Sequence, residues 1–235
     1  MRAVIKDKVE VARGTLLVTF DLLGDDVDFR PGQYFWVELL DPPYDDEKGA
    51  RRHITVVTSP TEHGVLGLAT RIRDSAFKRS LDELPVGTEV DVEQPKGEFV
   101  LPDDSERPYV FIAGGIGITV FRSMLRYIAD EQLPYRVTLL YSNRDRESTA
   151  FMGELHELER AIPGLGVVFT MTGDPGWDGE TRRIDAEFLR DHVEDLAGST
   201  YLVAGPPPMV EGVVEALQAA GIPEDQIRPD RFSGY

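Results

Sequence analysis

Two glycine-rich segments lie where an apolar run of the sequence gives way to an amphipathic one. Residues 113–119 hold three glycines after the apolar residues 110–112, and residues 204–209 hold one glycine and three prolines at the end of the run 200–204. Glycines at a strand-to-helix turn let the backbone approach a pyrophosphate, and the free amides of the helix N-terminus donate hydrogen bonds to it. We therefore predict that a dinucleotide binds at Gly114, Gly115, Ile116, Gly117, Thr119, Gly205, Pro206, Pro207 and Met209.

Each segment also has a plain structural interpretation. A tight turn without a ligand would explain the first, and a proline-rich helix start would explain the second. The strand before and the helix after the first segment favour the dinucleotide. Because strand ends in a doubly wound sheet converge on one edge, the two segments could hold one ligand from two sides.

The first half of the chain offers two further ways to hold phosphate. Arg51 and Arg52 lie beside the β-type run 53–57, where a guanidinium fork can bind phosphate oxygens. Ser75 is the expected N-cap of a short helix over 75–81, whose terminal amides can do the same. The alternative for the arginine pair is a solvated strand end.

The elements that must position these residues follow two different patterns. Up to about residue 101, short β-type runs separated by Gly, Pro and Asp predict an antiparallel β-barrel. From residue 109 on, apolar runs alternate with amphipathic stretches, which predicts a doubly wound parallel sheet with crossover helices. We therefore expect an all-β barrel domain at 1–102 and an α/β domain at 108–235. The expected strands are 14–22, 34–39, 53–57, 65–72 and 89–92, followed by strand and helix pairs at 109–113 and 120–129, 136–141 and 149–161, 167–171 and 186–192, and 200–204 and 209–219.

Composition excludes several classes of function. The 235 residues include 42 acidic and 25 basic side chains and carry a net charge of -17. Such an anionic surface repels the phosphates of DNA and RNA, so we expect no nucleic-acid partner. The plain interpretation of the acidic surface is that it keeps the protein soluble, including in a salty cytoplasm. The chain has no cysteine, so any iron–sulfur centre that it works with must sit on another protein. The four histidines lack metal-site spacing, so we expect no metal. Without a signal core or about 20 consecutive apolar residues, we expect no membrane span and a cytoplasmic location.

Six segments, taken in order, resemble the ferredoxin-NADP reductase superfamily over nearly the whole chain. The resemblance implies a flavin-binding antiparallel barrel followed by a nicotinamide-binding α/β domain, with the two cofactors meeting in the cleft between them. The flavin it implies is FAD, with FMN as the alternative. The matching segments are 30–35, 52–55, 75–78, 114–119, 205–209 and 232–235.

The same resemblance implies roles for individual residues. Arg52 would hold the flavin phosphate, Thr55 would hydrogen-bond near the reactive nitrogen, and Ile54 would pack on the ring, with His53 touching the flavin. Tyr235 resembles the C-terminal aromatic residue that covers the other flavin face, so we expect Thr55 and Tyr235 to act in catalysis; a frayed chain end is the alternative. The ribityl and pyrophosphate part is expected to lie along Thr70, Arg71, Ile72, Ser75, Ala76 and Phe77.

Three positions depart from the family pattern. Ile54 replaces the usual aromatic residue and cannot stack through a π-system. Val120 replaces a frequent proline that is suited to the first helical turn. Ala204 replaces a frequent cysteine, so hydride transfer would rest on positioning of the reactants.

The loop after the second strand of the α/β domain indicates the coenzyme. Ser142, Arg144 and Arg146 offer a hydroxyl and two guanidinium groups to a 2′-phosphate, and no carboxylate ends the strand to hold a ribose diol. We therefore predict NADPH over NADH. The alternative is that the arginines pair with Asp145 or Glu147 on a solvated loop.

These expectations together predict a flavoprotein reductase that moves a hydride from NADPH to FAD and passes electrons to a ferredoxin or flavodoxin. Two alternatives stay open. One is a diaphorase, free-flavin reductase or ferric reductase without a protein acceptor. The other is a non-catalytic dinucleotide-binding module that lost its flavin, which Ile54 and Val120 would suit.

Overall fold

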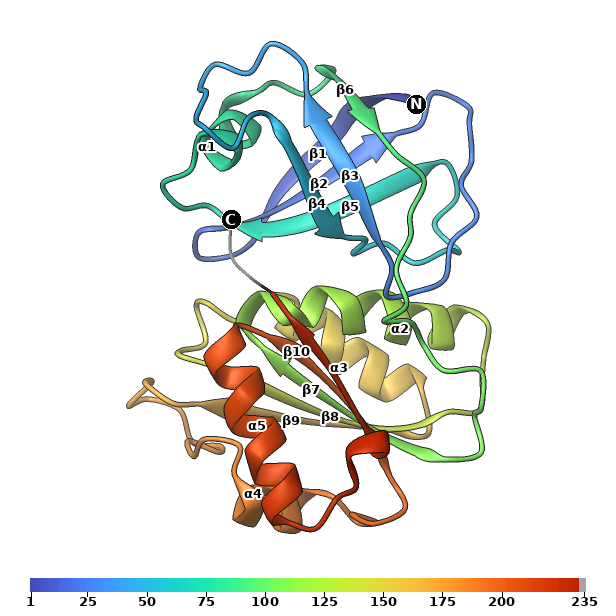
Figure 1. Ribbon diagram of the computed structural model, residues 1–235, viewed down its shortest axis with the longest axis vertical. Helices are drawn as coiled ribbons and strands as arrows, with labels where there is room; N and C mark the ends of the chain where they lie inside the picture. Colours follow the sequence, from blue (N-terminus) through green and yellow to red (C-terminus); the bar gives the residue numbers. More distant parts are fainter. Residues whose placement is uncertain (233–235) are drawn as a thin grey trace. The chain divides into compact units, whose positions relative to one another are not determined.

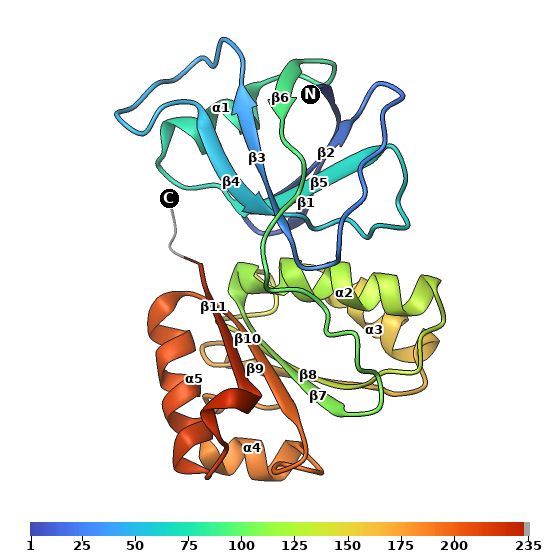
Figure 2. The same cartoon turned by 45° about the vertical axis from the view of Figure 1, so that its right-hand side comes forward.

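A computed structural model describes residues 1–232 of the chain (Figures 1 and 2). Its contacts group residues 1–101 with 122–127 in one unit and the remaining described residues in another. The first unit is built on a six-stranded sheet in the order β4-β3-β6-β1-β2-β5, and every pairing in it is antiparallel. Its elements are β1 (Arg2–Ala12), β2 (Thr15–Asp21), β3 (Tyr34–Leu39), β4 (Arg51–Thr55), β5 (Val65–Arg71), α1 (Ala76–Glu83) and β6 (Glu89–Val92).

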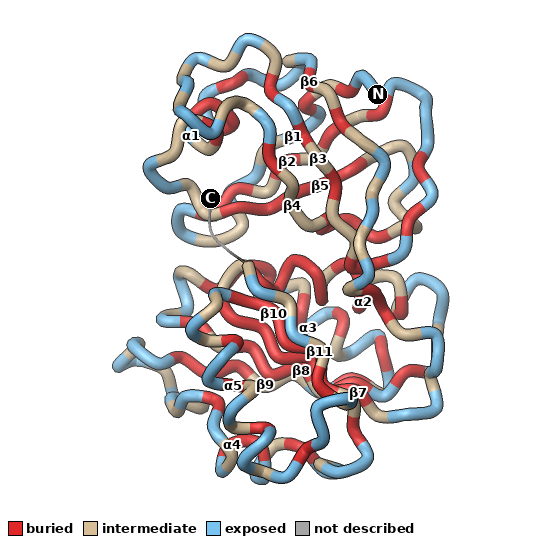
Figure 3. Tube along the Cα trace, viewed as in Figure 1, coloured by how far each residue is buried: buried red, intermediate tan, exposed pale blue. Residues whose placement is uncertain are grey.

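The sheet curls because the chain beyond β4 reaches β5 at the opposite edge. The amide of Val57 donates to the carbonyl of Gly67 at 2.9 Å, and the amide of Gly67 donates to the Thr58 hydroxyl at 3.0 Å. Side chains alternate between the two faces of each strand, so Phe20 of β2 and Phe35 of β3 point inward and meet edge to face, with ring centroids 6.1 Å apart. The result is the predicted barrel, with one apolar core inside it. Figure 3 marks the buried residues along its strands.

Helix α1 is held at both ends by side chains. The Ser75 hydroxyl accepts a hydrogen bond from the amide of Lys78 at 3.3 Å, which confirms Ser75 as the N-cap. At the other end the ammonium group of Lys8, from β1, donates to the carbonyls of Asp82 and Leu84. Lys8 therefore satisfies carbonyls that the end of the helix leaves without intrahelical partners.

The second unit is built on a parallel sheet in the order β11-β10-β7-β8-β9. Helices cover both faces, as Figures 1 and 2 show, so the predicted doubly wound sheet is confirmed. The strands are β7 (Pro108–Gly114), β8 (Arg136–Asn143), β9 (Leu165–Met171), β10 (Thr200–Gly205) and β11 (Ile227–Arg231); the helices are α2 (Ile118–Asp130), α3 (Met152–Ala161), α4 (Ala186–His192) and α5 (Pro207–Ala219), with short 3₁₀ turns at Gly115–Gly117 and Glu224–Gln226.

Alternate residues of β7 serve the two faces of this sheet. Phe111 stacks on Phe121 of α2 with ring centroids 4.8 Å apart. Val110 and Ile112 instead join the apolar cluster formed with α4 and α5, which includes Phe188. A strand that is apolar on both faces must be covered on both, which is why β7 reads as a continuous apolar run.

Several boundaries differ from the sequence-based expectation: β4 begins at Arg51 and not at 53, α2 at Ile118 and not at 120, and α5 at Pro207 and not at 209. Helix α3 begins at Met152 and not at 149, because Phe151 adopts a left-handed conformation with φ 61° and breaks the helical path. The first strand, β1, and the last, β11, were not among the expected elements. Among residues 1–232, no helix is both long enough and apolar enough to cross a bilayer.

Candidate functional site

Arg52 is the most deeply buried charged side chain of the flavin-side prediction, with 4% of its surface exposed. Its Nη1 donates to the carbonyls of Lys48, Gly49 and Arg51 at 2.7 to 2.8 Å. Its guanidinium carbon lies 5.3 Å from the ring centroid of Phe77 in the barrel core. The buried Nε has no hydrogen-bond partner among the described residues, so the guanidinium keeps an unused donor.

A carboxylate already sits at the N-terminus of α1 beside this guanidinium. Asp46 accepts from the amide of Ala76 at 3.2 Å and from the amide of Lys48 at 2.9 Å, and it lies 3.4 Å from Nη2 of Arg52. Burial works to raise the pKa of Asp46, but these amide hydrogen bonds and the charge of Arg52 outweigh it and hold the pKa below its ordinary value.

The surroundings of Asp46 form an anion site. Burial lowers the pKa of Lys78, and the charges of Arg73 and Arg52 lower it further. These three cationic side chains therefore lie close together at the start of α1. Guanidinium and helix-terminal amides are the donors that phosphate groups prefer. The residues present therefore fit the phosphate of a flavin, with the Asp46 carboxylate standing in for it.

The other flavin-side residues do not all gather there. Arg52 and Ile54 share one face of β4, and Ile54 and Ile72 are partly buried against the barrel core. His53 lies on the outer face between Tyr34 and Trp36, with centroids 5.3 and 5.0 Å away, and burial lowers its pKa. The structure thus brings Arg52, Ser75, Ala76 and Phe77 together and places His53 apart.

Three predicted residues lie elsewhere on the barrel strands. Thr55 pairs with Tyr34 at the end of β4 and is partly buried. Thr70 and Arg71 end β5, where Thr70 is buried and pairs with Leu16. The predicted catalytic Tyr235 lies outside the described residues.

In the second unit, the two glycine-rich segments lie against each other at the ends of β7 and β10, as expected from their parallel pairing. A Cβ atom on Gly117 would lie 2.2 Å from the carbonyl oxygen of Ala204, and one on Gly205 would lie 3.2 Å from the backbone of Gly114. A Cβ on Gly114 would come within 2.9 Å of the Met209 sulfur. The packing of the two segments therefore requires a glycine at 117 and leaves little room for a side chain at 114 and 205, a reason that the sequence did not supply.

The remaining residues of the first segment are fixed by local hydrogen bonds. The Thr119 hydroxyl is buried and donates to the carbonyl of Ile116 at 3.0 Å, so it braces the turn. Gly115 adopts φ 52°, and its carbonyl accepts from the hydroxyl of the buried Tyr141 at 3.0 Å. The second segment continues into α5, whose N-cap is Pro206 and whose first residue is Pro207. The amides at the glycine-rich turn before α2 remain suited to a pyrophosphate, whereas α5 starts with prolines, which have no N–H, and the amide of Met209 donates to the carbonyl of Pro206.

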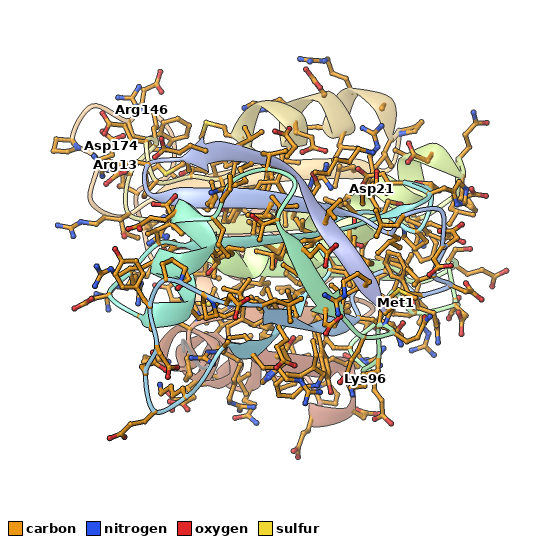
Figure 4. All side chains as sticks on the ribbon, turned by 90° about the horizontal axis from the view of Figure 1, so that it is seen from above. Met1, Arg13, Asp21, Lys96, Arg146 and Asp174 are labelled. Carbon is orange, nitrogen blue, oxygen red and sulfur yellow. The ribbon has the colours of Figure 1, made fainter. Side chains whose placement is uncertain are left out.

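The coenzyme loop carries an ion pair that the sequence did not indicate. Nε of Arg146 lies 2.9 Å from Asp174, whose carboxylate also accepts from the Arg146 amide at 3.3 Å (Figure 4). The hydrogen bond from Arg146 holds the pKa of Asp174 below its ordinary value. The carboxylate therefore comes from the loop after β9. Arg144 lies against that loop, because its carbonyl accepts from the amide of Gly173 at 2.8 Å, and Ser142 is partly buried in β8 beside Gly114.

Sequence reasoning missed two polar residues at strand ends of this sheet. Asn143 ends β8 with 6% of its surface exposed, and neither atom of its side-chain amide has a partner among residues 1–232. Asp230 pairs with Ala204 across β11 and β10, and burial raises its pKa. A polar residue that closes an apolar strand is the signal that marks Asn143. No group of three or more His, Asp or Glu in the described part of the chain could hold a metal ion.

Comparison with protein families matches each half of the chain to a different model. Residues 2–101 match the oxidoreductase FAD-binding domain, and residues 111–215 match the oxidoreductase NAD-binding domain. Together the two matches span both units and both phosphate-binding arrangements described above.

Two curated relatives are named as components of monooxygenases, and one solved structure as a cytochrome P450 reductase. The chain is 32% identical over 170 residues to methane monooxygenase component C of Methylosinus trichosporium, covering 72% of this chain and 48% of that protein. It is 28% identical over 212 residues to the reductase component of propane 2-monooxygenase of Rhodococcus jostii, covering 88% and 56%. The crystal structure of the Amycolatopsis cytochrome P450 reductase GcoB superposes with a TM-score of 0.82 at 25% identity, over 99% of this chain and 70% of that one. The chain thus spans about half the length of the curated relatives it matches.

Proposed function

Because this chain belongs to the ferredoxin-NADP reductase superfamily, with an FAD-binding and an NAD-binding domain, we propose that it transfers a hydride from NAD(P)H to bound FAD and passes the electrons to a separate acceptor. The observation that supports the proposal is that Arg52 and the amide of Ala76, donors that suit a phosphate, meet at one carboxylate, that of Asp46. Bound FAD would supply the group that accepts a hydride and releases electrons one at a time.

The residues of the chain would bind and orient the two cofactors. Arg52 and the amide of Ala76 would hold the flavin phosphate, and the Thr55 hydroxyl would hydrogen-bond to the flavin ring. The glycine-rich turn around Gly114 would present backbone amides to the dinucleotide, and the segment around Gly205 would pack beside that turn. Tyr235 is proposed to cover the flavin ring, and its removal should then change the flavin absorption spectrum in the presence of oxidised coenzyme.

NADPH is the proposed coenzyme, with NADH as the alternative. Support comes from Ser142, Arg144 and Arg146, which lie at and after the end of β8. Arg146 would exchange the Asp174 carboxylate for the 2′-phosphate, which carries up to two negative charges and is the stronger acceptor. Steady-state assays with both coenzymes test this preference directly.

The proposed acceptor is a protein that carries a redox centre of its own. A ferredoxin or flavodoxin fits the absence of cysteine, because an iron–sulfur cluster must then be held outside these 235 residues. The names of the relatives add oxygenase components to the acceptors worth testing. A cytoplasmic location forms part of this proposal, and cell fractionation tests it.

The test begins with the colour of the purified protein. We expect a yellow protein whose flavin band bleaches when NADPH is added without oxygen, and we expect cytochrome c to be reduced faster when a ferredoxin is present. A colourless protein that binds neither FAD nor FMN in a fluorescence titration would overturn the proposal. Fast reduction of free flavin or ferric chelates, with no gain from any protein acceptor, would favour the diaphorase alternative.

A further inference from the structure

We propose that Asp46 is a resident counterion of the flavin-phosphate site, which competes with the flavin phosphate and so weakens the binding of phosphorylated flavins. The inference rests on the proposed flavin binding and assigns a new role to a loop residue. Asp46 uses the two donors expected to bind that phosphate, since it contacts both Nη2 of Arg52 and the amide of Ala76.

The loop that carries Asp46 is built to cover α1. Residues 40–50 connect β3 to β4, and Tyr44 fixes the loop to the helix. The amide of Tyr44 donates to the Ser80 hydroxyl at 3.1 Å, its own hydroxyl bonds to Glu83 at 2.8 Å, and Arg79 lies 3.9 Å from its ring centroid. Tyr44 thereby holds the loop beside the later part of the helix, and Asp46 reaches the N-terminus.

The difference in burial between Arg52 and Asp46 explains why the two side chains make this contact. The side chain of Arg52 is only 5% exposed, whereas that of Asp46 is 32% exposed. A buried guanidinium is unfavourable without an anion beside it, so an empty site needs a negative charge. Asp46 supplies that charge from a position that water reaches. A ligand can therefore displace its carboxylate without exposing a buried side chain.

Two anions cannot share these donors at low cost. A phosphate monoester such as FMN carries a charge of about -1.5 to -2 at neutral pH, and repulsion from a carboxylate at the same donors opposes its binding. Riboflavin has the same ring without the phosphate, so Asp46 should leave its binding unchanged. A role confined to capping α1 would affect both ligands alike.

The experiment compares Asp46→Asn with wild type and with Asp45→Asn, which makes the same charge change at the exposed neighbouring residue. Flavin-free full-length protein is titrated with FMN and with riboflavin, and ring fluorescence is measured. We expect Asp46→Asn to tighten FMN binding about tenfold and to change riboflavin binding by less than about twofold. Asp45→Asn should move neither affinity by more than about twofold. Equal or weaker FMN binding in Asp46→Asn, or an equal change for both flavins, would overturn the inference.

Inorganic phosphate separates this inference from the proposed function. Phosphate alone should raise the thermal unfolding midpoint of Asp46→Asn more than that of wild type, because it stabilises only the state that binds it. If neither flavin binds but phosphate has this effect, the anion site and the competition by Asp46 are supported and the proposed function is wrong. If phosphate has the same effect on both proteins, Asp46 does not compete for the site.

Discussion

The two arginines proposed to bind phosphate differ most in their exposure to water. Arg52, in the barrel, has a side chain 5% exposed and meets its carboxylate at 3.4 Å. Arg146, in the α/β unit, has a side chain 50% exposed and meets Asp174 at 2.9 Å. The shorter ion pair is therefore the more exposed one.

Exposure to water, and not the distance between the charges, decides how much each ion pair contributes to stability. An exposed pair contributes about 0 to 1 kcal/mol, because water and salt screen both charges. A buried charge that loses its partner costs several kcal/mol, because nothing replaces the lost solvation. The barrel site should therefore bind its phosphate as part of the core, and the coenzyme loop should bind its phosphate as a tunable surface contact.

The largest expected effect comes from removing the buried arginine. Arg52→Ala should weaken FAD binding about ten- to hundredfold, since a charge-assisted hydrogen bond contributes about 1.5 to 3 kcal/mol. Equilibrium titration of the flavin-free protein measures this loss. The matched control is Arg51→Ala on the same strand, where an exposed guanidinium lies 4.5 Å from the ring centroid of Trp36. If the two variants lose affinity equally, the barrel does not bind phosphate through a buried charge.

The second largest effect is expected on the stability of the α/β unit, where the two glycine-rich segments pack against each other. Gly117→Ala should destabilise the protein by about 1 to 3 kcal/mol, because its Cβ would lie 2.2 Å from the Ala204 carbonyl oxygen. Gly212→Ala is the control, since it lies in α5 with nothing within 4 Å of the new Cβ and should stabilise by about 0.4 to 1 kcal/mol. Chemical denaturation measures both. Equal stability of Gly117→Ala and wild type would contradict the close packing of the two segments.

A smaller effect is expected at the exposed arginine. Arg146→Ala should raise the Michaelis constant for NADPH about two- to fivefold and leave that for NADH unchanged, and the difference should shrink at high salt. Asp174→Asn should act in the opposite direction, because it releases the guanidinium for the 2′-phosphate. Arg160→Ala, at the exposed end of α3, serves as the control. A large effect that resists salt would show that the coenzyme loop behaves like the buried site.

The smallest effect concerns a half-buried carboxyl group. Burial raises the pKa of Asp230, so the folded state holds a proton more tightly than the unfolded state does. The contribution of Asp230 to folding stability is then greatest below the ordinary pKa of aspartate, about 3.9, and falls as pH rises through the raised pKa. Asp230→Asn should remove this loss, raising the unfolding midpoint at pH 7 and not at low pH. A midpoint gain that is the same at every pH would contradict the assignment to ionisation.

The sequence was sufficient for elements whose signals are local. The period-2 run of β2, the Ser75 cap and the apolar strand β7 each identify themselves within about ten residues. Two strands were missed. Strand β1 has only two buried side chains and a register shift between Ile5 and Asp7, so its alternation is broken. The edge strand β11 contains Pro229, which breaks a strand pattern but is tolerated at a sheet edge.

At the candidate site, local sequence signals predicted the cationic residues but not the residues that pair with them. The sequence indicated arginines suited to phosphate, but neither Asp46 nor Asp174 could be identified as their partners, because each partnership depends on how a loop folds back. Asn143 had a local signal, as a polar residue that closes an apolar strand, but its burial is set by neighbouring strands that its own sequence does not describe. What sequence cannot supply is the identity of partners brought together by the fold.

The position of β1 in its sheet has a consequence for how the barrel is made. This strand lies between β2, which follows it directly, and β6, which contributes residues 89–92. A nascent chain can therefore form the β1–β2 hairpin early, but it cannot complete the sheet until residue 92 has left the ribosome. Until then, one edge of β1 presents unpaired backbone groups, which is the condition under which newly made β-proteins associate with one another or with chaperones.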